Sequence, residues 1–497
     1  MPGFLPFLPR AVALAAWLAL AGSAPALATD AAQAQQEAQA LEAGRALLAL
    51  AQAPAQGDLP AMRTRGTIRV LVNWSRTSFA IENGQPRGPA YELMNGFGEW
   101  LNAREGRDDH RAPKLRLLFV PVHFNEMLPR LLAGHGDIAA ASLTVSDAQA
   151  RLVAFSRPLV INVAEVIVAH RGTPPLAQLE DLAGKRLMVE AGTAEHDAAL
   201  ALSARLVAAG LPAIDVQVAP AALEVDDLLE MVNSGAVPYL AADSHVALLW
   251  ARVLPNIVVH RDLELAAQRS VAAALRPEST ELRAAFDAYL AEHGDRSHAS
   301  AAENFARAFT DASPLRNPNH PPVLRNAQEL APHFRHHSDQ VGVAWLLMLA
   351  QGFQESGLNP EARNPSGAVG VMQVLPTTGR ELGFPDVHAA EPNIAAGIRY
   401  MDKLRRTYFN DAAISPENQV FFALAGYNAG PNRIVRLRHR AAEQGLDPNV
   451  WFGNVERIVL QAVGQETVRY VGNIYRYFVM FSASPELTGP ELAARQR

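Results

Sequence analysis

The pattern of apolar residues changes once along this chain, and that change constrains the fold more than any other feature. From Gly66, short apolar runs typical of strands alternate with stretches of helical periodicity, as in α/β domains. From about residue 326 the pattern is mostly helical. With 497 residues, the chain is long enough for about three globular units. We therefore expect a multidomain protein in which an α/β region precedes a mostly α region.

The expected elements follow from the two patterns. In the first region we expect strands at 67–72, 115–122, 137–143, 184–189 and 239–243, and helices at 91–101 and 124–132. In the second region we expect helices at 341–353, 394–407, 416–427, 432–444 and 467–481. The sequence shows no internal repeat and no glycine-rich phosphate loop.

The ends and joins of these regions differ in composition. Arg10, the apolar run 11–22 and the small-residue site Ala26-Leu27-Ala28 predict a signal peptide over 1–28 and export from the cytoplasm. Residues 29–63 form an Ala/Gln-rich leader, predicted to be helical and to end at Pro54 and Pro60. The Pro- and Asn-rich stretch 294–325 predicts a linker, and 486–497 a tail. No later apolar run reaches the roughly 20 residues that span a bilayer.

Composition excludes several classes of function. Without cysteine the chain has no disulfide, no thiolate metal site, no cysteine nucleophile and no lipid-modified cysteine. A formal net charge of -6 argues against nucleic acid as the main partner. No metal site and no cofactor is predicted. Arg433, Arg436, Arg438 and Arg440 form either a solvated helix face or a contact with an acidic polymer or a membrane surface.

Glu355 is the main candidate for catalysis. The helix expected over 341–353, capped by Ser338 or Asp339, carries a buried apolar stripe, and Gly357, with Asn359 and Pro360, ends it just beyond Glu355. A carboxyl group at this place can be half-buried by its own helix and still face a substrate. Burial of this kind raises the pKa of a carboxyl group and allows it to donate a proton near neutrality.

Four ordered motifs surround this glutamate. They are Glu355-Ser356, Gly370-Val371-Met372-Gln373, Gly426-Tyr427-Asn428-Ala429-Gly430, and Glu466-Thr467 with Tyr470-Val471. Together they resemble the soluble lytic transglycosylase type of peptidoglycan-cleaving enzyme, which implies a lysozyme-like helical fold over about 326–485. In such enzymes one carboxyl group acts first as acid and then as base, while the MurNAc 6-hydroxyl attacks the anomeric carbon and leaves a 1,6-anhydro ring.

The resemblance implies roles for further residues around the glutamate. The substrate-binding candidates are Asn364, Met372, Gln373, Tyr427, Asn428, Glu466 and Tyr470. Asn364 stands where many of these enzymes have a serine, and the loop reads Gly-Val-Met-Gln rather than Gly-Leu-Met-Gln. Alternatives stay open: Met372 can be a core residue, Asn428 part of a helix stop, and Glu466 an acid at a helix start.

The first region resembles the family 3 solute-binding proteins over about 64–293. Its anchors include Gly66 to Val70, Gly134 to Ala140, Phe155-Ser156 and Gly184-Lys185. The resemblance implies a periplasmic-binding-protein-like domain, with lobe 1 at about 64–163 and 261–293 and lobe 2 at about 164–260. It also implies that the two strands that cross between the lobes form a hinge.

The same resemblance suggests residues that bind a small ligand. These candidates are Thr144, Arg151, Thr193 and Asp243. The position at which such receptors clamp a carboxylate with arginine carries Gln149, and Arg151 lies two residues further on. An amide does not replace the charge of a guanidinium, so ordinary amino-acid binding is not expected unless Arg151 compensates. The ligand can also be different, or the lobes can serve as a scaffold.

The order of the two regions is similar to that of the membrane-bound lytic murein transglycosylase F family. The resemblance implies a lyase that cleaves the MurNAc-GlcNAc bond of peptidoglycan glycan strands, regulated by a small amino-acid-like or muropeptide ligand. It also implies a periplasmic enzyme peripheral to the outer membrane of a Gram-negative bacterium. A hydrolytic muramidase with the same Glu355, or a glycan or solute receptor without catalysis, remains the alternative.

Overall fold

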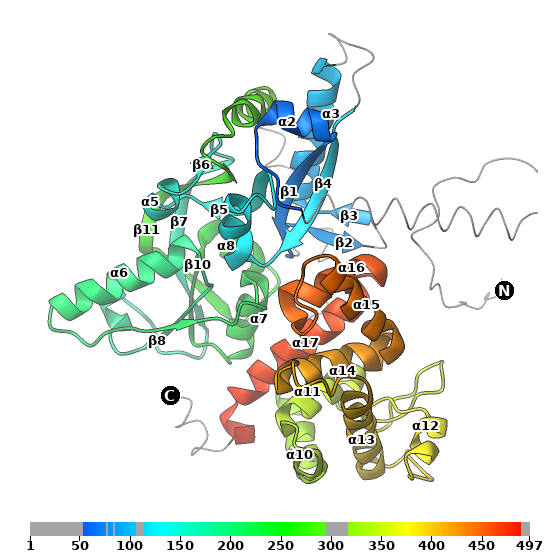
Figure 1. Cartoon of the computed structure of the whole chain (residues 1–497). Coiled ribbons are helices and arrows are strands. Elements are labelled where there is room, and N and C mark those ends of the chain that lie inside the picture. The colour runs from blue at the N-terminus through cyan, green and yellow to red at the C-terminus, as the bar shows by residue number, and fades with distance from the viewer. Residues whose placement is uncertain (1–52, 76–77, 83–84, 106–113, 294–316, 489–497) are drawn as a thin grey trace, which may run out of the picture.

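The computed structural model describes residues 53–75, 78–82, 85–105, 114–293 and 317–488. Within these ranges the chain forms an α/β part, here called the amino-terminal module (53–293), and a helical part, the helical module (317–488). Figure 1 shows the two modules packed side by side. This division confirms the predicted fold class. The predicted signal peptide, most of the leader, and most of the linker and tail lie outside the described residues.

One continuous sheet runs through both lobes of the amino-terminal module. Its strand order is β4-β1-β5-β11-β7-β10-β8-β9, and β6 pairs with β11 at the side. The β1 strand is parallel to β4 and β5, while β11 is antiparallel to β5 and to β7. All seven residues of β1 are buried, as expected for a strand covered on both faces.

Lobe 1 contains one end of this sheet and its covering helices. Its elements are α2 (Leu59–Arg65), β1 (Thr67–Asn73), β2 (Ala80–Glu82), β3 (Gln85–Arg87), α3 (Pro89–Glu105), β4 (Arg116–Val122), η1 (Phe124–Glu126), α4 (Met127–Leu132), β5 (Ile138–Thr144), α5 (Asp147–Ala150), β6 (Ala154–Phe155) and a helix at 280–293. Two apolar clusters, one on each face of the sheet, form its core.

Lobe 2 contains the other end. Its elements are η2 (Leu179–Leu182), β8 (Arg186–Val189), α6 (Ala194–Ala208), β9 (Asp215–Val218), α7 (Val225–Ser234), β10 (Tyr239–Asp243) and α8 (Ser244–Trp250). The predicted strand 239–243 coincides with β10. The long strands β7 (Val160–His170) and β11 (Ile257–Leu275) join the lobes and pair along most of their length, with several register shifts. They occupy the place predicted for the hinge.

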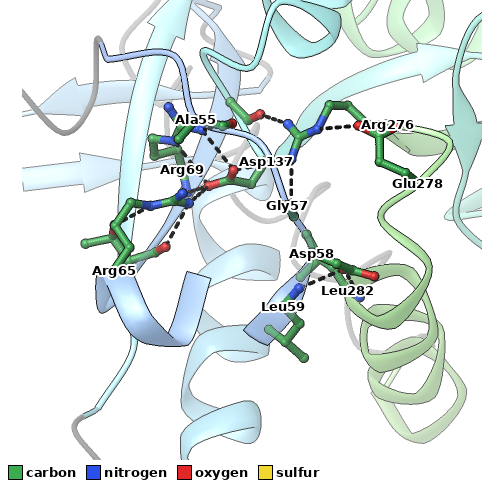
Figure 2. Close-up of polar contacts among 12 residues, drawn as sticks. Ala55, Gly57, Asp58, Leu59, Arg65, Arg69, Asp137, Arg276, Glu278 and Leu282 are labelled. Carbon is green, nitrogen blue, oxygen red and sulfur yellow. Dashed lines mark hydrogen bonds and ion pairs between the residues drawn. The ribbon is translucent and has the colours of Figure 1, made fainter. Parts of the chain in front are cut away.

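A buried ion cluster fastens the segment before β1 to lobe 1 (Figure 2). Asp137 accepts hydrogen bonds from Arg65 Nη2 at 2.6 Å and from Arg69 Nη2 at 2.9 Å, and Arg276 Nη2 lies 3.6 Å from it. Arg69 also donates to the carbonyl oxygen of Ala55 at 3.0 Å. A buried carboxylate with several guanidinium partners is costly to break, so this cluster fixes residues 55–69 on the lobe.

The helical module packs eight α-helices and a short π-helical turn around a single core, counted over the described residues. They are α10 (Pro321–Val341), α11 (Trp345–Ser356), α12 (Pro376–Glu381), α13 (Ala390–Tyr408), α14 (Pro416–Ala429), α15 (Pro431–Glu443), η3 (Trp451–Val455), α16 (Glu456–Ala462) and α17 (Gln465–Ser482). Residues 420–426 of α14 are all buried, which identifies α14 as the central helix.

Three predicted boundaries differ from the structure. The helix expected at 341–353 begins later: α10, for which no helix was predicted, ends at Val341, Gly342 adopts φ 68°, and α11 begins at Trp345, so Ser338 and Asp339 lie inside α10 and do not cap α11. The predicted linker overlaps α10, because Pro321 occupies a first-turn position where its missing N–H costs nothing. For the same reason Pro60 lies in the first turn of α2 and does not end a leader helix.

The two modules meet along lobe 2. One apolar cluster continues from lobe 2 residues such as Leu228 and Met231 into the core of the helical module. At its edge, Arg476 Nη1 of α17 lies 2.8 Å from Asp227 and 2.9 Å from Glu230, both on α7. Apolar contact and a buried ion pair therefore fix lobe 2 to the helical module. In the part of the chain that the structure describes, no helix combines the length and apolar character needed to cross a membrane.

Candidate active site

Glu355 lies in the last turn of α11, and its side chain is half-buried. Eight consecutive residues of this helix, 346–353, are buried, so the helix is held on most of its circumference. Gly357 ends it with φ 69°, a left-handed conformation that glycine adopts without steric cost. The burial of α11 and its glycine cap thus position the carboxyl group as the sequence predicts.

A chain of hydrogen bonds orients the Glu355 carboxyl group. The Tyr470 hydroxyl on α17 donates to Glu355 Oε1 at 2.5 Å, and Gln351 Nε2 donates to the Tyr470 oxygen at 3.2 Å. Gln351 and Tyr470 are buried. Because this donor chain occupies Oε1, the other carboxyl oxygen of Glu355 is the one that can carry a transferable proton.

The electrostatic environment of Glu355 suits a proton donor. Burial raises the pKa of Glu355 to about 7, although the Tyr470 hydrogen bond lowers it in part. No other acid of the described chain contributes to this shift. Burial and the nearby Glu355 charge also raise the pKa values of Tyr427 and Tyr470, so both phenols stay protonated. The site therefore holds one carboxyl group, protonated in part at neutral pH, beside two neutral hydroxyl groups.

The loop at 370–373 packs against the end of α11. Ser356 Oγ donates to the carbonyl oxygen of Val371 at 2.8 Å. A Cβ atom at Gly370 would lie 2.5 Å from Asn393 Nδ2, so this close approach requires glycine. Gln373 adopts φ 47°, and its amide donates to the carbonyl oxygen of Gly370 at 2.9 Å. The loop is tightly held, with backbone strain stored at Gln373 beside the catalytic candidate.

Tyr427 joins the central helix to the same loop. Its hydroxyl donates to the carbonyl oxygen of Met372 at 2.9 Å, and its ring contacts Tyr400 at 5.1 Å between centroids. Met372 is fully buried, and its backbone N–H donates to Asn393 Oδ1 at 2.8 Å. The burial of Met372 supports the alternative in which it is a core residue, rather than the one in which it contacts a sugar.

The other predicted residues lie at the surface of the helical module. Asn364 is exposed and accepts a hydrogen bond from the Ser366 N–H at 3.0 Å. Asn428 is exposed and accepts one from Thr467 Oγ1 at 2.7 Å, which ties α14 to α17. Glu466 is exposed in the first turn of α17. The structure therefore brings Glu355, Tyr427, Gln373 and Tyr470 together, and leaves the exposed residues free to contact a substrate.

Three residues of the site received no role from the sequence. Gln351 precedes Glu355 by one helical turn, so the i, i+4 spacing was a signal that could have identified it. Ser356 was part of a motif, but its bond to Val371 joins two segments and has no local pattern. Asn393 donates to the carbonyl oxygens of Val369 and Val387, both at 2.8 Å, and no motif marked it.

The predicted ligand residues of the amino-terminal module separate into two groups. Thr144, Thr193 and Asp243 line a cavity between the lobes. Thr144 Oγ1 donates to Asp243 Oδ2 at 2.6 Å, and the Thr193 hydroxyl caps α6 by accepting from the His196 N–H at 3.2 Å. Arg151 is exposed, is absent from the cavity lining, and donates to the carbonyl oxygen of Asp147 at 3.0 Å.

The modules also share a charged junction. His123 of lobe 1 lies 3.4 Å from Glu224 of lobe 2 and 3.2 Å from Glu456 of α16. Burial alone would lower the pKa of His123, but hydrogen bonds and the charges of the two glutamates outweigh it and raise the pKa to about 10. The imidazolium therefore connects three structural parts at one point. Among the described residues, no group of three or more His, Asp or Glu side chains is placed to hold a metal ion.

Comparison with known protein families assigns a module to each half of the chain. Residues 67–301 match the bacterial extracellular solute-binding proteins, family 3. Residues 333–448 match the transglycosylase SLT domain, a range that includes Glu355 and Tyr427 and ends before Tyr470.

Two curated relatives are similar to this chain along most of its length. A membrane-bound lytic murein transglycosylase F of Desulfosudis oleivorans is 27% identical over 84% of this chain and 90% of its own length. The protein of that name from Ectopseudomonas mendocina is 27% identical over 88% of this chain and 90% of its own.

Among solved structures, an amino acid ABC transporter substrate-binding protein of Streptococcus pneumoniae bound to L-arginine is 19% identical. It covers 50% of this chain and 99% of its own, with a TM-score of 0.41. An ancestral arginine-binding protein bound to arginine is 22% identical, covers 50% of this chain and 99% of its own length, and has a TM-score of 0.39. The chain thus joins a family 3 solute-binding module to a transglycosylase SLT module, and most of its length is similar to proteins named membrane-bound lytic murein transglycosylase F.

Proposed function

We propose that this protein is a peptidoglycan lytic transglycosylase in which Glu355 is the acid and the base. It cleaves the β-1,4 bond between MurNAc and GlcNAc and leaves a 1,6-anhydro-MurNAc end. The SLT module and the relatives of the same architecture support the reaction class. The observation that carries the mechanism is a half-buried glutamate, hydrogen-bonded by Tyr470, whose pKa is raised to about 7 without the influence of a second acid.

Among the described residues no second acid acts on the pKa of Glu355, and this supports one way of breaking the bond. Glycosidases usually use two carboxyl groups, one as acid and one as nucleophile or base. Here the pKa of Glu355 responds to burial and to Tyr470, and to no other carboxyl group of the described chain. A nucleophile from the substrate itself removes the need for a second acid, because the MurNAc 6-hydroxyl is already held near the anomeric carbon.

Two proton transfers, of two different protons, then use the same side chain. Protonated Glu355 gives its proton to the glycosidic oxygen as the bond from C1 to that oxygen breaks. The resulting carboxylate takes the proton of the 6-hydroxyl as its oxygen forms the new bond to C1. Tyr470 donates to Glu355 Oε1 throughout, stabilises the carboxylate between the two steps, and keeps the carboxyl group in one orientation. No water is consumed, and Glu355 ends protonated as it began.

The neighbouring residues position the substrate. Gln373 and Tyr427 hold the 370–373 loop against α11, and exposed Asn364, Asn428 and Glu466 offer polar groups to the sugars around the bond. We place the protein in the bacterial envelope, as a periplasmic enzyme peripheral to the outer membrane. The predicted signal peptide and the membrane-bound relatives support this location.

The amino-terminal module gives the enzyme a means of regulation. A small ligand held between the lobes changes their relative position, and His123 contacts both lobe 2 and α16. Differential binding of the ligand to open and closed lobes would therefore alter the junction with the helical module.

Product analysis tests the reaction. Purified peptidoglycan is digested with the full-length protein, and the ends of the released fragments are identified by mass spectrometry. We expect anhydro ends, each one water lighter than a reducing end, and no such products from the Glu355→Gln variant. Reducing ends from the wild type would instead identify a hydrolytic muramidase, and intact glycan would identify a receptor without catalysis.

A further inference from the structure

The cavity between the lobes is lined from both sides by polar side chains. Its volume is about 160 Å³. Lobe 1 contributes Asn73, Ser78, Thr144 and Gln149, and lobe 2 contributes Glu190, Thr193, Glu195, Asp243 and His245. The lobes already touch across it, because Thr144 donates to Asp243 and Gln149 Nε2 donates to the carbonyl oxygen of Gly192 at 3.2 Å. The cavity is therefore a formed site in a closed pair of lobes.

Several buried acceptor atoms of this cavity lack a hydrogen-bond donor. They are Asn73 Oδ1, Gln149 Oε1, Glu190 Oε1 and Asp243 Oδ1. The side chains that carry them are between 5% and 9% exposed. Buried acceptors of this kind are normally satisfied, because an acceptor that loses its water without gaining a donor destabilises the folded state. Four of them around one cavity indicate a ligand that brings hydrogen-bond donors.

The same lining offers no charged group to an anion. Among the described residues that line the cavity there is no lysine and no arginine. His245 is neutral, because burial lowers its pKa to about 4. Gln149, at the position predicted for a carboxylate clamp, uses its amide N–H on Gly192 and presents its oxygen unpaired. A carboxylate placed here would lie among acidic side chains and would find only neutral donors, such as the Ser78 hydroxyl.

From this geometry we propose that the interlobe cavity binds an organic cation, an amine or a guanidinium, that carries no carboxylate. The cation lies against Asp243 Oδ1 and Glu190 Oε1, and its N–H groups also reach Gln149 Oε1 and Asn73 Oδ1. This deepens the proposed ligand of the amino-terminal module, and it depends on neither glycan cleavage nor Glu355. Ion pairing with hydrogen bonds in a desolvated site provides the affinity.

Protonation of the acids that line the cavity gives the proposal a second measurable consequence, the release of protons on binding. Burial, and then the charge of neighbouring acids, raises the pKa of Glu190 well above its usual value. Burial and the charge of Asp243 raise the pKa of Glu195 to about 8, and burial raises that of Asp243 to about 7. A cation lowers such pKa values, so its binding releases protons. A carboxylate ligand would have the opposite effect and take up protons.

Calorimetry on the full-length protein tests the proposal with two probes that differ by one group. Agmatine is L-arginine without its carboxylate. We expect agmatine to bind at least roughly ten-fold more tightly than L-arginine, because the carboxylate of L-arginine would lie against acids. We also expect the binding enthalpy to vary with buffer ionisation in the direction of proton release. Tighter binding of L-arginine, proton uptake, or no agmatine binding at millimolar concentration would each overturn the proposal.

A matched pair of variants connects the affinity to the cavity. Glu190→Gln removes from the lining a carboxyl group that can ionise against a cation, with little change of shape, and we expect roughly ten-fold weaker agmatine binding. Glu180→Gln makes the same change at an exposed residue of the same lobe, and should leave agmatine binding unaltered. Thermal unfolding of both variants verifies that they fold. Equal agmatine affinity in the two folded variants would contradict the assignment, whether or not the protein cleaves peptidoglycan.

Discussion

The two modules both bury carboxyl groups with raised pKa values, but for different reasons. In the helical module Glu355 is alone, and burial raises its pKa to about 7. In the amino-terminal module, Glu190 and Glu195 lie within one cavity, where burial and the charges of neighbouring acids act together. In this chain the isolated buried acid suits a proton donor, whereas the cluster of buried acids suits a site for a positive charge. A raised pKa alone therefore does not identify a catalytic residue, and the groups that surround the acid have to be considered with it.

The largest effect is expected when the isolated acid is removed. Glu355→Gln should lower the rate of anhydro product formation by about 10³-fold, because an amide can neither donate nor accept the catalytic proton. The rate is measured by quantifying anhydro ends during digestion of purified peptidoglycan. Glu361→Gln, at an exposed position on the following turn, serves as the control and should stay within two-fold of wild type. Equal losses in both variants would remove the distinction between Glu355 and other acids.

The charged junction between the modules should give the next effect. His123→Ala leaves Glu224 and Glu456 buried without their shared cation, so we expect the free energy of unfolding to fall by about 3 kcal/mol. Because the folded pKa is raised to about 10, the stabilisation is full below pH 6.5 and is lost as the pH rises through 10.

Urea denaturation at pH 6 and pH 10 measures this contribution. His388→Ala removes an exposed histidine that also pairs with a carboxylate, Asp386, and should cost less than about 0.5 kcal/mol. If His123→Ala costs as little as His388→Ala, the junction does not hold the modules together.

Protonation of Glu355 should also appear in the stability of the protein. The pKa of Glu355 rises on folding from 4.5 to about 7, so the folded state loses stability as the pH rises between these values. Glu355→Gln removes the penalty and should raise the free energy of unfolding at pH 8 by about 2 kcal/mol relative to wild type, with little difference at pH 4. Urea denaturation at both pH values measures it. A difference of equal size at pH 4 would show that burial of the charge is not the cause.

The smallest effect concerns the hydrogen bond of Tyr470. This bond lowers the pKa of Glu355, so Tyr470→Phe should raise that pKa further and move the fall in activity at alkaline pH upward by about one pH unit. The measurement is the pH profile of turnover. Tyr408→Phe, on α13, makes the same change elsewhere in the module and should not move the profile. A shift to lower pH would contradict the role given to Tyr470.

Much of the fold could be predicted because its elements are local. The α/β region was separated from the helical region, and the predicted strands lie within or next to the observed ones, as at 67–72 and β1. The helix that carries Glu355 was predicted to start too early, at Val341, because the apolar run continues across Gly342 to α11, and α10 was not predicted. Pro321 was interpreted as part of a linker and Pro60 as the end of a helix, whereas both lie in the first turn of a helix.

The site could be predicted only in part, because contacts between residues that lie far apart in the sequence leave no local pattern. Glu355 and its motifs are compact patterns, so the candidates could be named. The junction joins His123 to Glu456, 333 positions away, and no local pattern links them. The cavity acids come from different elements, with Glu190 after β8, Glu195 in α6 and Asp243 at the end of β10. Only the folded structure shows that these acids face one cavity, whose described lining includes no lysine and no arginine.

The apolar cluster shared by lobe 2 and the helical module determines which part can move. Separating these two would expose a continuous core and break the Arg476 ion pairs, whereas lobe 1 meets α16 through the polar contact of His123. We therefore expect lobe 2 and the helical module to move as one rigid body, with lobe 1 rotating against it about β7 and β11. Opening of the lobes would then separate the His123 imidazolium of lobe 1 from both Glu224 and Glu456, and so change the charged contact at the start of α16.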